Sequence, residues 1–231
     1  MVPGRPEPNL LQSLDLTNVQ FPVGDSSGQW LAYATLVPLT VLISYAAWLA
    51  ARREAACLIM FVGQLLNELL NSVLKTKWAK ERPTTFLGEG YGMPSSHSQF
   101  MAFLTIYGML HLHTYVQFRQ VGWKYLVDFG LVVVSLTVAF SRIYLWYHSV
   151  AQVGMGLAIG TAFGLTYFAF IKYVIRPSGF IEWLVNHPLG QWVYLRDTTL
   201  SVHNVLEQEY LWHMSHQKNA AMNPADAKKS Q

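Results

Sequence analysis

Five long apolar runs separated by short polar segments dominate the hydropathy pattern of the chain. They cover residues 30–50, 55–74, 99–115, 125–145 and 150–174. A transmembrane helix needs about 20 mostly apolar residues to cross a hydrocarbon layer about 30 Å thick. A single run of this kind could be a buried core helix, but five in one short chain favour membrane crossing. The pattern predicts an all-α, multi-pass transmembrane helix bundle with about five spans plus an interfacial segment.

Two of the runs carry information beyond their hydropathy. The second run is the weakest predicted span because it contains the polar residues Gln64, Asn67, Glu68 and Asn71. Such side chains can hydrogen-bond one helix to another inside a membrane. The fifth run contains glycines with four-residue spacings, at positions 154, 156, 160 and 164. Small residues at that spacing predict a close contact with a neighbouring helix.

The segments around the runs divide the chain into four parts. Residues 1–29 contain several prolines and lack the basic and then apolar layout of a cleaved signal peptide, so we expect a retained lumenal segment. Residues 30–176 form the predicted transmembrane catalytic domain. Residues 177–216 carry Trp183 and Trp192 around an interruption at Pro188, which predicts an interfacial segment on the cytosolic side. Residues 217–231 are predicted to be a polar cytosolic tail.

Composition narrows the class of protein further. Charged residues make up 13% of the chain, about half the roughly 25% usual for soluble proteins, and 52% of the residues are hydrophobic. A disordered protein would be richer in charge and poorer in apolar residues. The single cysteine, Cys57, excludes an internal disulfide framework and a cysteine zinc site. The 16 basic residues are spread along the chain and form no nucleic-acid footprint.

The basic residues also predict which way the chain crosses the membrane. By the positive-inside rule, one side is cytosolic because it receives Arg52, Arg53, Arg119, Lys124, Lys172 and Arg176. The loop after the second run falls on the lumenal side, yet it is basic too, with Lys75, Lys77, Lys80 and Arg82. The positive-inside rule therefore holds only if these lumenal cations are kept there for a function other than setting the orientation.

A polar constellation at the predicted lumenal ends of the spans supplies that function. Lys75 and Arg82 follow the second run, and Ser95, Ser96 and His97 precede the third. Arg142 closes the fourth run and His148 precedes the fifth. Cations and hydroxyls together suit a phosphate oxyanion. Two histidines suit a nucleophile and a general acid in phosphoryl transfer.

Each of these residues has a simpler interpretation when taken alone. Lys75, Arg82 and Arg142 could be interfacial cations at helix ends, and each histidine could be a polar residue at the start of a helix. Glu68 could join Asn67 in bonding helices together, although an ionisable residue within a span predicts a functional role by default. His111 and His113 are expected to be interfacial or solvated.

The three groups, in this order and placement, resemble the three signature motifs of the type 2 phosphatidic acid phosphatase superfamily. The matching residues are Lys75 with Arg82-Pro83, then Pro94-Ser95-Ser96-His97, then Ser141-Arg142 with His148. Within that superfamily the chain is most similar to the enzymes that act on dolichyl diphosphate. This similarity rests on the residue runs 21–25, 91–101, 141–148 and 195–199.

The resemblance implies a role for each residue. His148 would attack the terminal phosphorus and become phosphohistidine, and His97 would protonate the leaving oxygen. The phosphoryl oxygens would be held by Lys75, Arg82, Ser95, Ser96 and Arg142. The superfamily more often has glycine where Ser96 stands, so Ser96 could contribute only its backbone N–H. Gln152 stands where the superfamily pattern has an aspartate, and it is expected to support His148, with Glu68 as a more distant partner.

The implied activity is metal-independent hydrolysis of a polyprenyl diphosphate lipid without a cofactor. Dolichyl diphosphate would be cleaved to dolichyl phosphate and phosphate at the lumenal face of the endoplasmic reticulum, which recycles the carrier for protein N-glycosylation. Another lipid phosphate such as phosphatidate is an alternative substrate, and a non-enzymatic lipid-phosphate binder is an alternative class. Lys228 and Lys229 resemble a dilysine retrieval signal, which predicts residence in the endoplasmic reticulum and a cytosolic C-terminus.

Overall fold

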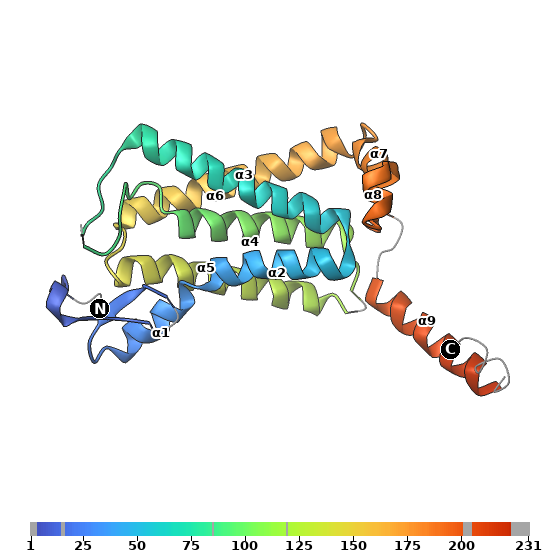
Figure 1. Ribbon diagram of the computed structural model, residues 1–231, viewed down its shortest axis with the longest axis horizontal. Coiled ribbons are helices and arrows are strands. Elements are labelled where there is room, and N and C mark those ends of the chain that lie inside the picture. The colour runs from blue at the N-terminus through green and yellow to red at the C-terminus, as the bar shows by residue number, and fades with distance from the viewer. Residues whose placement is uncertain (1–3, 15–16, 85, 119, 201–204, 223–231) are drawn as a thin grey trace.

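The computed structural model describes residues 4–14, 17–84, 86–118, 120–200 and 205–222. Five long helices form a bundle (Figure 1): α2 Val37–Arg52, α3 Ala55–Trp78, α4 Ser96–Tyr115, α5 Gly122–Tyr144 and α6 Val150–Phe170. Helix α4 lies in the middle of the bundle and packs most extensively against α6, then against α5 and α3. A π-helical turn, Ile171–Ile175, extends α6. The predicted helix bundle is therefore confirmed.

Four helical stretches within the described residues are long and apolar enough to cross a membrane, namely Ser26–Arg52, Ala55–Trp78, Gly122–Tyr144 and Val150–Ile175. The second predicted span is among them despite its polar residues. Helix α4 corresponds to the third predicted span but falls short of the others in hydropathy. Its polar side chains Ser98, Gln99 and Thr105 are buried within the bundle. A central helix enclosed by its neighbours does not need a fully apolar surface.

The first predicted span is not one continuous helix. It is divided into α1 Ser26–Ala34 and α2 Val37–Arg52, with Thr35 and Leu36 between them. Pro38 stands in the first turn of α2, where its missing N–H and fixed φ are tolerated but would interrupt a continuing helix. Helix α1 begins at Ser26, where the Asp25 side chain accepts a hydrogen bond from the Gly28 N–H at 2.9 Å. It packs against α5.

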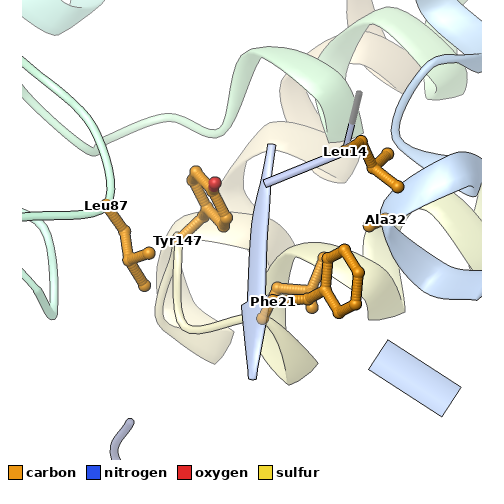
Figure 2. Close-up of a cluster of buried hydrophobic side chains, with 6 residues drawn as sticks. Leu14, Phe21, Ala32, Leu87 and Tyr147 are labelled. Atoms are coloured by element: carbon orange, nitrogen blue, oxygen red, sulfur yellow. The ribbon is translucent and has the colours of Figure 1, made fainter. Parts of the chain in front are cut away.

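The N-terminal segment adds a small sheet that the all-α prediction did not include. Strands β1 Leu11–Ser13 and β2 Gln20–Pro22 pair antiparallel, after a short 3-10 helix at Pro8–Leu10. This hairpin and α1 share a buried apolar cluster with the α3–α4 loop and the α5–α6 turn (Figure 2). The cluster consists of Leu14, Phe21, Ala32, Leu87, Leu145 and Tyr147. The segment is therefore packed onto the same end of the bundle as that loop and turn.

Close packing joins α4 to α6, as the glycine spacing predicted. A Cβ atom on Gly156 would come within 2.6 Å of the Ser95 carbonyl oxygen, and one on Gly160 would overlap the Gln99 carbonyl. Gly154 differs, because a Cβ there would meet no atom within 4 Å. Only the glycines at positions 156, 160 and 164 face α4.

A seam of buried amides joins α4 to α3. Asn71 Nδ2 donates to Gln99 Oε1 at 2.8 Å, and Gln99 Nε2 donates to Asn67 Oδ1 at 3.0 Å. The polar residues of the second run therefore bond helices to each other, which was the structural interpretation of Asn67 and Asn71.

The opposite end of the bundle holds the C-terminal helices (Figure 1): α7 Phe180–Asn186, α8 Pro188–Trp192 and α9 Val205–Met222. The break before Pro188 is where the sequence predicted it. Helix α9 continues past residue 217, so the first residues of the predicted polar tail are helical. Arg176 pairs with Asp197 at 2.9 Å at this end. Arg119, Lys228 and Lys229, used above to predict orientation, lie outside the described residues.

Candidate active site

The residues predicted to carry chemistry converge at the end of the bundle next to the N-terminal hairpin. Lys75, near the end of α3, reaches the hydroxyl of Ser96 at 3.5 Å. Arg82, in the α3–α4 loop, places its Nη1 3.4 Å from Nε2 of His148. The backbone N–H of His148 donates to the Arg142 carbonyl at 3.0 Å. All three sequence groups therefore meet in one place.

The cations of this cluster lie close together without forming ion pairs to carboxylates. Among the described residues, Lys75, Arg82 and Arg142 form no ion pair with an Asp or Glu within 4.0 Å. Arg142 is only 5% exposed, and its Nε meets no hydrogen-bond partner within the same part of the chain. Uncompensated buried charge is costly unless an opposite charge binds there. The arrangement therefore suits a multiply charged anion.

His148 lies in the short turn between α5 and α6 and is 3% exposed. Burial lowers the pKa of its imidazole to about 2, and the nearby guanidinium groups of Arg142 and Arg82 act in the same direction. The ring is therefore neutral at physiological pH. A neutral imidazole has a lone pair available for nucleophilic attack.

Gln152 determines which ring nitrogen of His148 carries the proton. Its Nε2 donates to the Glu81 carbonyl at 2.7 Å, and its Oε1 accepts from the Ser149 N–H at 3.1 Å, which fixes the orientation of the amide. Oε1 lies 3.2 Å from Nδ1 of His148. Nδ1 must therefore be the donor, and Nε2 is left unprotonated beside Arg82.

The other predicted residues lie around this core. His97, in the first turn of α4, is hydrogen-bonded to the backbone of Thr35, in the break between α1 and α2. Ser95 is fully buried, and its N–H donates to the Gln152 carbonyl at 3.1 Å. Its hydroxyl accepts from Ser98 at 3.1 Å. Ser95 thus ties α4 to α6 next to the site.

Glu68 stands about two turns before Lys75 on α3, and the two groups interact electrostatically. Its Oε1 is buried without a hydrogen-bond partner. The described contacts do not join it to His148, so a supporting role stays a prediction. The described residues contain no group of three or more His, Cys, Asp or Glu side chains arranged to hold a metal ion.

Comparison with known proteins gives the family. The family model of the PAP2 superfamily matches residues 55–176, which is more than half of the chain. The chain belongs to the PAP2 superfamily. The matched range contains every residue of the predicted site, so the family membership predicted from the three motifs is confirmed.

The curated relatives fall in the expected branch of the PAP2 superfamily. The chain is 35% identical to human dolichyldiphosphatase 1 over 205 residues, covering 84% of this chain and 85% of the human protein. It is 34% identical to dolichyldiphosphatase of Saccharomyces cerevisiae over 213 residues, covering 89% and 88%. It is also 32% identical to lipid phosphate phosphatase gamma of Arabidopsis thaliana over 212 residues, covering 88% and 91%.

A solved structure of the same superfamily shares the fold. A transmembrane PAP2-type phosphatidylglycerolphosphate phosphatase of Bacillus subtilis superimposes with a TM-score of 0.54 at 21% identity. The match covers 65% of this chain and 79% of that one.

Three residues that are not among the predicted site residues also touch this PAP2 site. Tyr147 stacks under Arg142, with the guanidinium carbon 4.0 Å from the ring centroid. Gly92 allows the chain to pass close to Gln152, because a Cβ there would come within 2.7 Å of the amide nitrogen. Thr35 contacts His97. Tyr147 stands directly before His148, which is the only sequence signal among the three.

Proposed function

We propose that this chain hydrolyses dolichyl diphosphate to dolichyl phosphate and phosphate at the lumenal face of the endoplasmic reticulum. The product would return to use as the lipid carrier for protein N-glycosylation. The similarity to proteins named dolichyldiphosphatase supports dolichyl diphosphate as the substrate. The observation that carries the chemistry is a neutral imidazole, with one nitrogen left unprotonated by the bond to Gln152. It lies among three cations that form no ion pair with a carboxylate of the described residues.

The proposed reaction has two displacements. Nε2 of His148 forms a bond to the terminal phosphorus, and the bond from that phosphorus to the bridging oxygen breaks. The imidazolium form of His97, which the negative charge of the bound diphosphate favours, donates a proton to that oxygen and becomes neutral, so dolichyl phosphate leaves. Water then attacks phosphohistidine, with His97 taking its proton, and phosphate departs while Nε2 is restored. Lys75, Arg82 and Arg142 stabilise the charge on the phosphoryl oxygens in both steps.

Phosphate release from dolichyl diphosphate by the purified chain tests this proposal. His148→Ala should abolish release, whereas His213→Ala, an exposed histidine on α9, should leave it unchanged. Rapid quenching with substrate labelled in the terminal phosphate should trap an acid-labile phosphoenzyme in the wild type and none in His148→Ala. An adduct trapped on His97 would show that the two histidine roles are exchanged.

Phosphatidate, offered in the same detergent, tests the alternative substrate. The proposal expects dolichyl diphosphate to have the higher kcat/KM. A preference for phosphatidate would assign the chain to the broader lipid phosphate phosphatases.

A further inference from the structure

Tyr147 contacts both arginines of the site. The guanidinium of Arg142 lies over the face of its ring, 4.0 Å from the centroid. Nη1 of Arg82 donates to its backbone carbonyl at 3.4 Å. The same residue precedes the proposed nucleophile His148. One residue therefore touches two of the three cations that form no ion pair within the described parts of the chain.

The ring of Tyr147 is itself held by the N-terminal hairpin. Its hydroxyl oxygen accepts a hydrogen bond from the backbone N–H of Gln20 at 2.9 Å. The residue is 7% exposed and belongs to the apolar cluster with Phe21 of the hairpin and Leu87 of the α3–α4 loop (Figure 2). The ring therefore has little freedom to turn away from Arg142.

The chemistry of these contacts has a consequence for anion binding. A carboxylate would hold a buried guanidinium firmly but would cancel its charge and repel a phosphate. The face of an aromatic ring and a carbonyl oxygen both attract a cation while carrying no net charge. Held this way, Arg142 and Arg82 keep their positive charge for the substrate.

We propose that Tyr147 is a positioning residue that orients Arg142 and Arg82 toward the phosphate groups without neutralising them, and that the N-terminal hairpin is part of the active site because it fixes this ring. The proposal rests on the phosphate site of the proposed function and extends it to residues outside the matched family range. It assigns a positioning role to a segment that carries none of the three motifs.

A double-mutant cycle tests whether Tyr147 acts through Arg142. Tyr147→Leu should lower kcat/KM about 30-fold, which is the scale of a desolvated cation–π contact. In an Arg142→Ala background the same change should cost less than about twofold, because the partner is gone. Equal losses in the two backgrounds would mean that Tyr147 contributes only packing and would overturn the proposal.

Matched variants separate the ring from its hydroxyl and from local packing. Tyr147→Phe keeps the ring and loses only the bond from Gln20, so kcat/KM should stay within about fivefold of wild type. Tyr144→Leu removes a neighbouring tyrosine whose hydroxyl also contacts the N-terminal segment, at Asp25, and should change activity less than about twofold. A loss in Tyr147→Phe as large as in Tyr147→Leu would contradict the role given to the ring.

Fluorinated phenylalanines at position 147 keep the shape of the side chain and give a test that does not depend on how well Tyr147→Leu folds. Each added fluorine weakens the negative potential of the ring face, so kcat/KM should fall stepwise from phenylalanine to pentafluorophenylalanine. A flat series would overturn the proposal.

Orthovanadate binding tests the role of Tyr147 separately from the proposal that dolichyl diphosphate is the substrate. Wild type should bind vanadate, and Tyr147→Leu should bind it at least about tenfold more weakly, whatever lipid is the substrate. If that holds while dolichyl diphosphate is not hydrolysed, the substrate is wrong and the role of Tyr147 stands. If dolichyl diphosphate is hydrolysed equally well by wild type and Tyr147→Leu, the role of Tyr147 falls and the function stands.

Discussion

At the scale of single residues, Gln152 sets the chemical character of His148, the proposed nucleophile. Its amide oxygen holds the Nδ1 proton of His148 but offers no negative charge to the imidazolium that would develop as Nε2 bonds to phosphorus. An aspartate would offer that charge and make His148 a stronger nucleophile. A diphosphate substrate tolerates the weaker one, because its leaving group is a phosphate monoester and far less basic than an alkoxide.

Two substitutions of Gln152 should therefore change the hydrolysis rates in different ways. Gln152→Ala should lower kcat on dolichyl diphosphate about tenfold, or about 1.4 kcal/mol, because the imidazole loses its fixed tautomer. Gln152→Asp should raise activity on monophosphate lipids relative to diphosphates. The measurement is the ratio of the two hydrolysis rates in wild type and Gln152→Asp. If the ratio is unchanged or shifts toward diphosphates, Gln152 does not determine the preference for a diphosphate substrate.

The lowered pKa of His148 predicts that stability falls in acid. Its pKa is about 2 in the folded state and about 6.5 in an unfolded chain, so below pH 6.5 the unfolded chain takes up a proton that the folded chain does not. Folding stability should therefore drop as the pH falls below about 6.5, while above it the group contributes no pH dependence. Thermal unfolding at pH 7.5 and pH 5 should show a smaller acid loss in His148→Gln than in wild type. Equal losses in the two proteins would contradict the shifted pKa.

At the scale of helices, the contact between α4 and α6 fixes the distance between the two histidines. His97 opens α4, and His148 lies just before α6, so a displacement of either helix changes the site. The glycines at positions 156 and 160 let the two backbones approach closely. At these two positions α6 presents no side chain that could hold the helices apart.

Substitution of these glycines should therefore impair both stability and activity. Gly160→Ala is expected to cost about 1–3 kcal/mol of folding free energy, because the new Cβ overlaps the Gln99 carbonyl. Gly154→Ala is the matched control on the same helix, since its Cβ meets open space and alanine favours a helix. Unfolding temperature and phosphate release are the two measurements. Similar effects of the two substitutions would contradict the close contact.

At the scale of the whole molecule, the two ends of the bundle differ in their charges. In the part of the chain that the structure describes, Lys75, Arg82 and Arg142 at one end form no ion pair with a carboxylate. At the other end, Arg176 pairs with Asp197 and Arg196 pairs with Glu54 at 2.7 Å. The basic loop that conflicts with the positive-inside rule belongs to the first end. Its cations are accounted for by the site, so the rule favours a cytosolic location for the other end.

This distribution predicts the topology. An epitope placed at the C-terminus should be accessible to antibody when only the plasma membrane is permeabilised, and one placed in the N-terminal hairpin should be protected until internal membranes are opened. A protected C-terminal epitope would overturn the orientation.

The positive end also predicts activity without a metal ion. In the proposed mechanism, Lys75, Arg82 and Arg142 supply the charge stabilisation that divalent cations give in metal-dependent phosphatases. Phosphate release should be unchanged in excess EDTA. A loss that magnesium restores would count against the proposed mechanism.

The sequence by itself determined the class of the protein and predicted which polar residues come together at one end of the bundle. Apolar runs of membrane-spanning length fix helices, because a lipid-exposed backbone must satisfy its own hydrogen bonds. The three motifs lie at the ends of those runs. Because each helix crosses the membrane, residues at the ends that share one face of the membrane can meet. The sequence also placed Gln152 four residues after His148, and in the structure its amide reaches the imidazole from the first turn of α6.

Only the tertiary structure decided the contacts that orient the side chains of those residues. Pro38 divides the first span and brings the Thr35 backbone to His97. The hairpin holds Tyr147 under Arg142, and the Glu81 carbonyl orients Gln152. These contacts join segments far apart in the chain through backbone atoms and ring faces. Backbone groups are the same for every residue type, so no sequence pattern marks which of them will meet a catalytic side chain until the chain has folded.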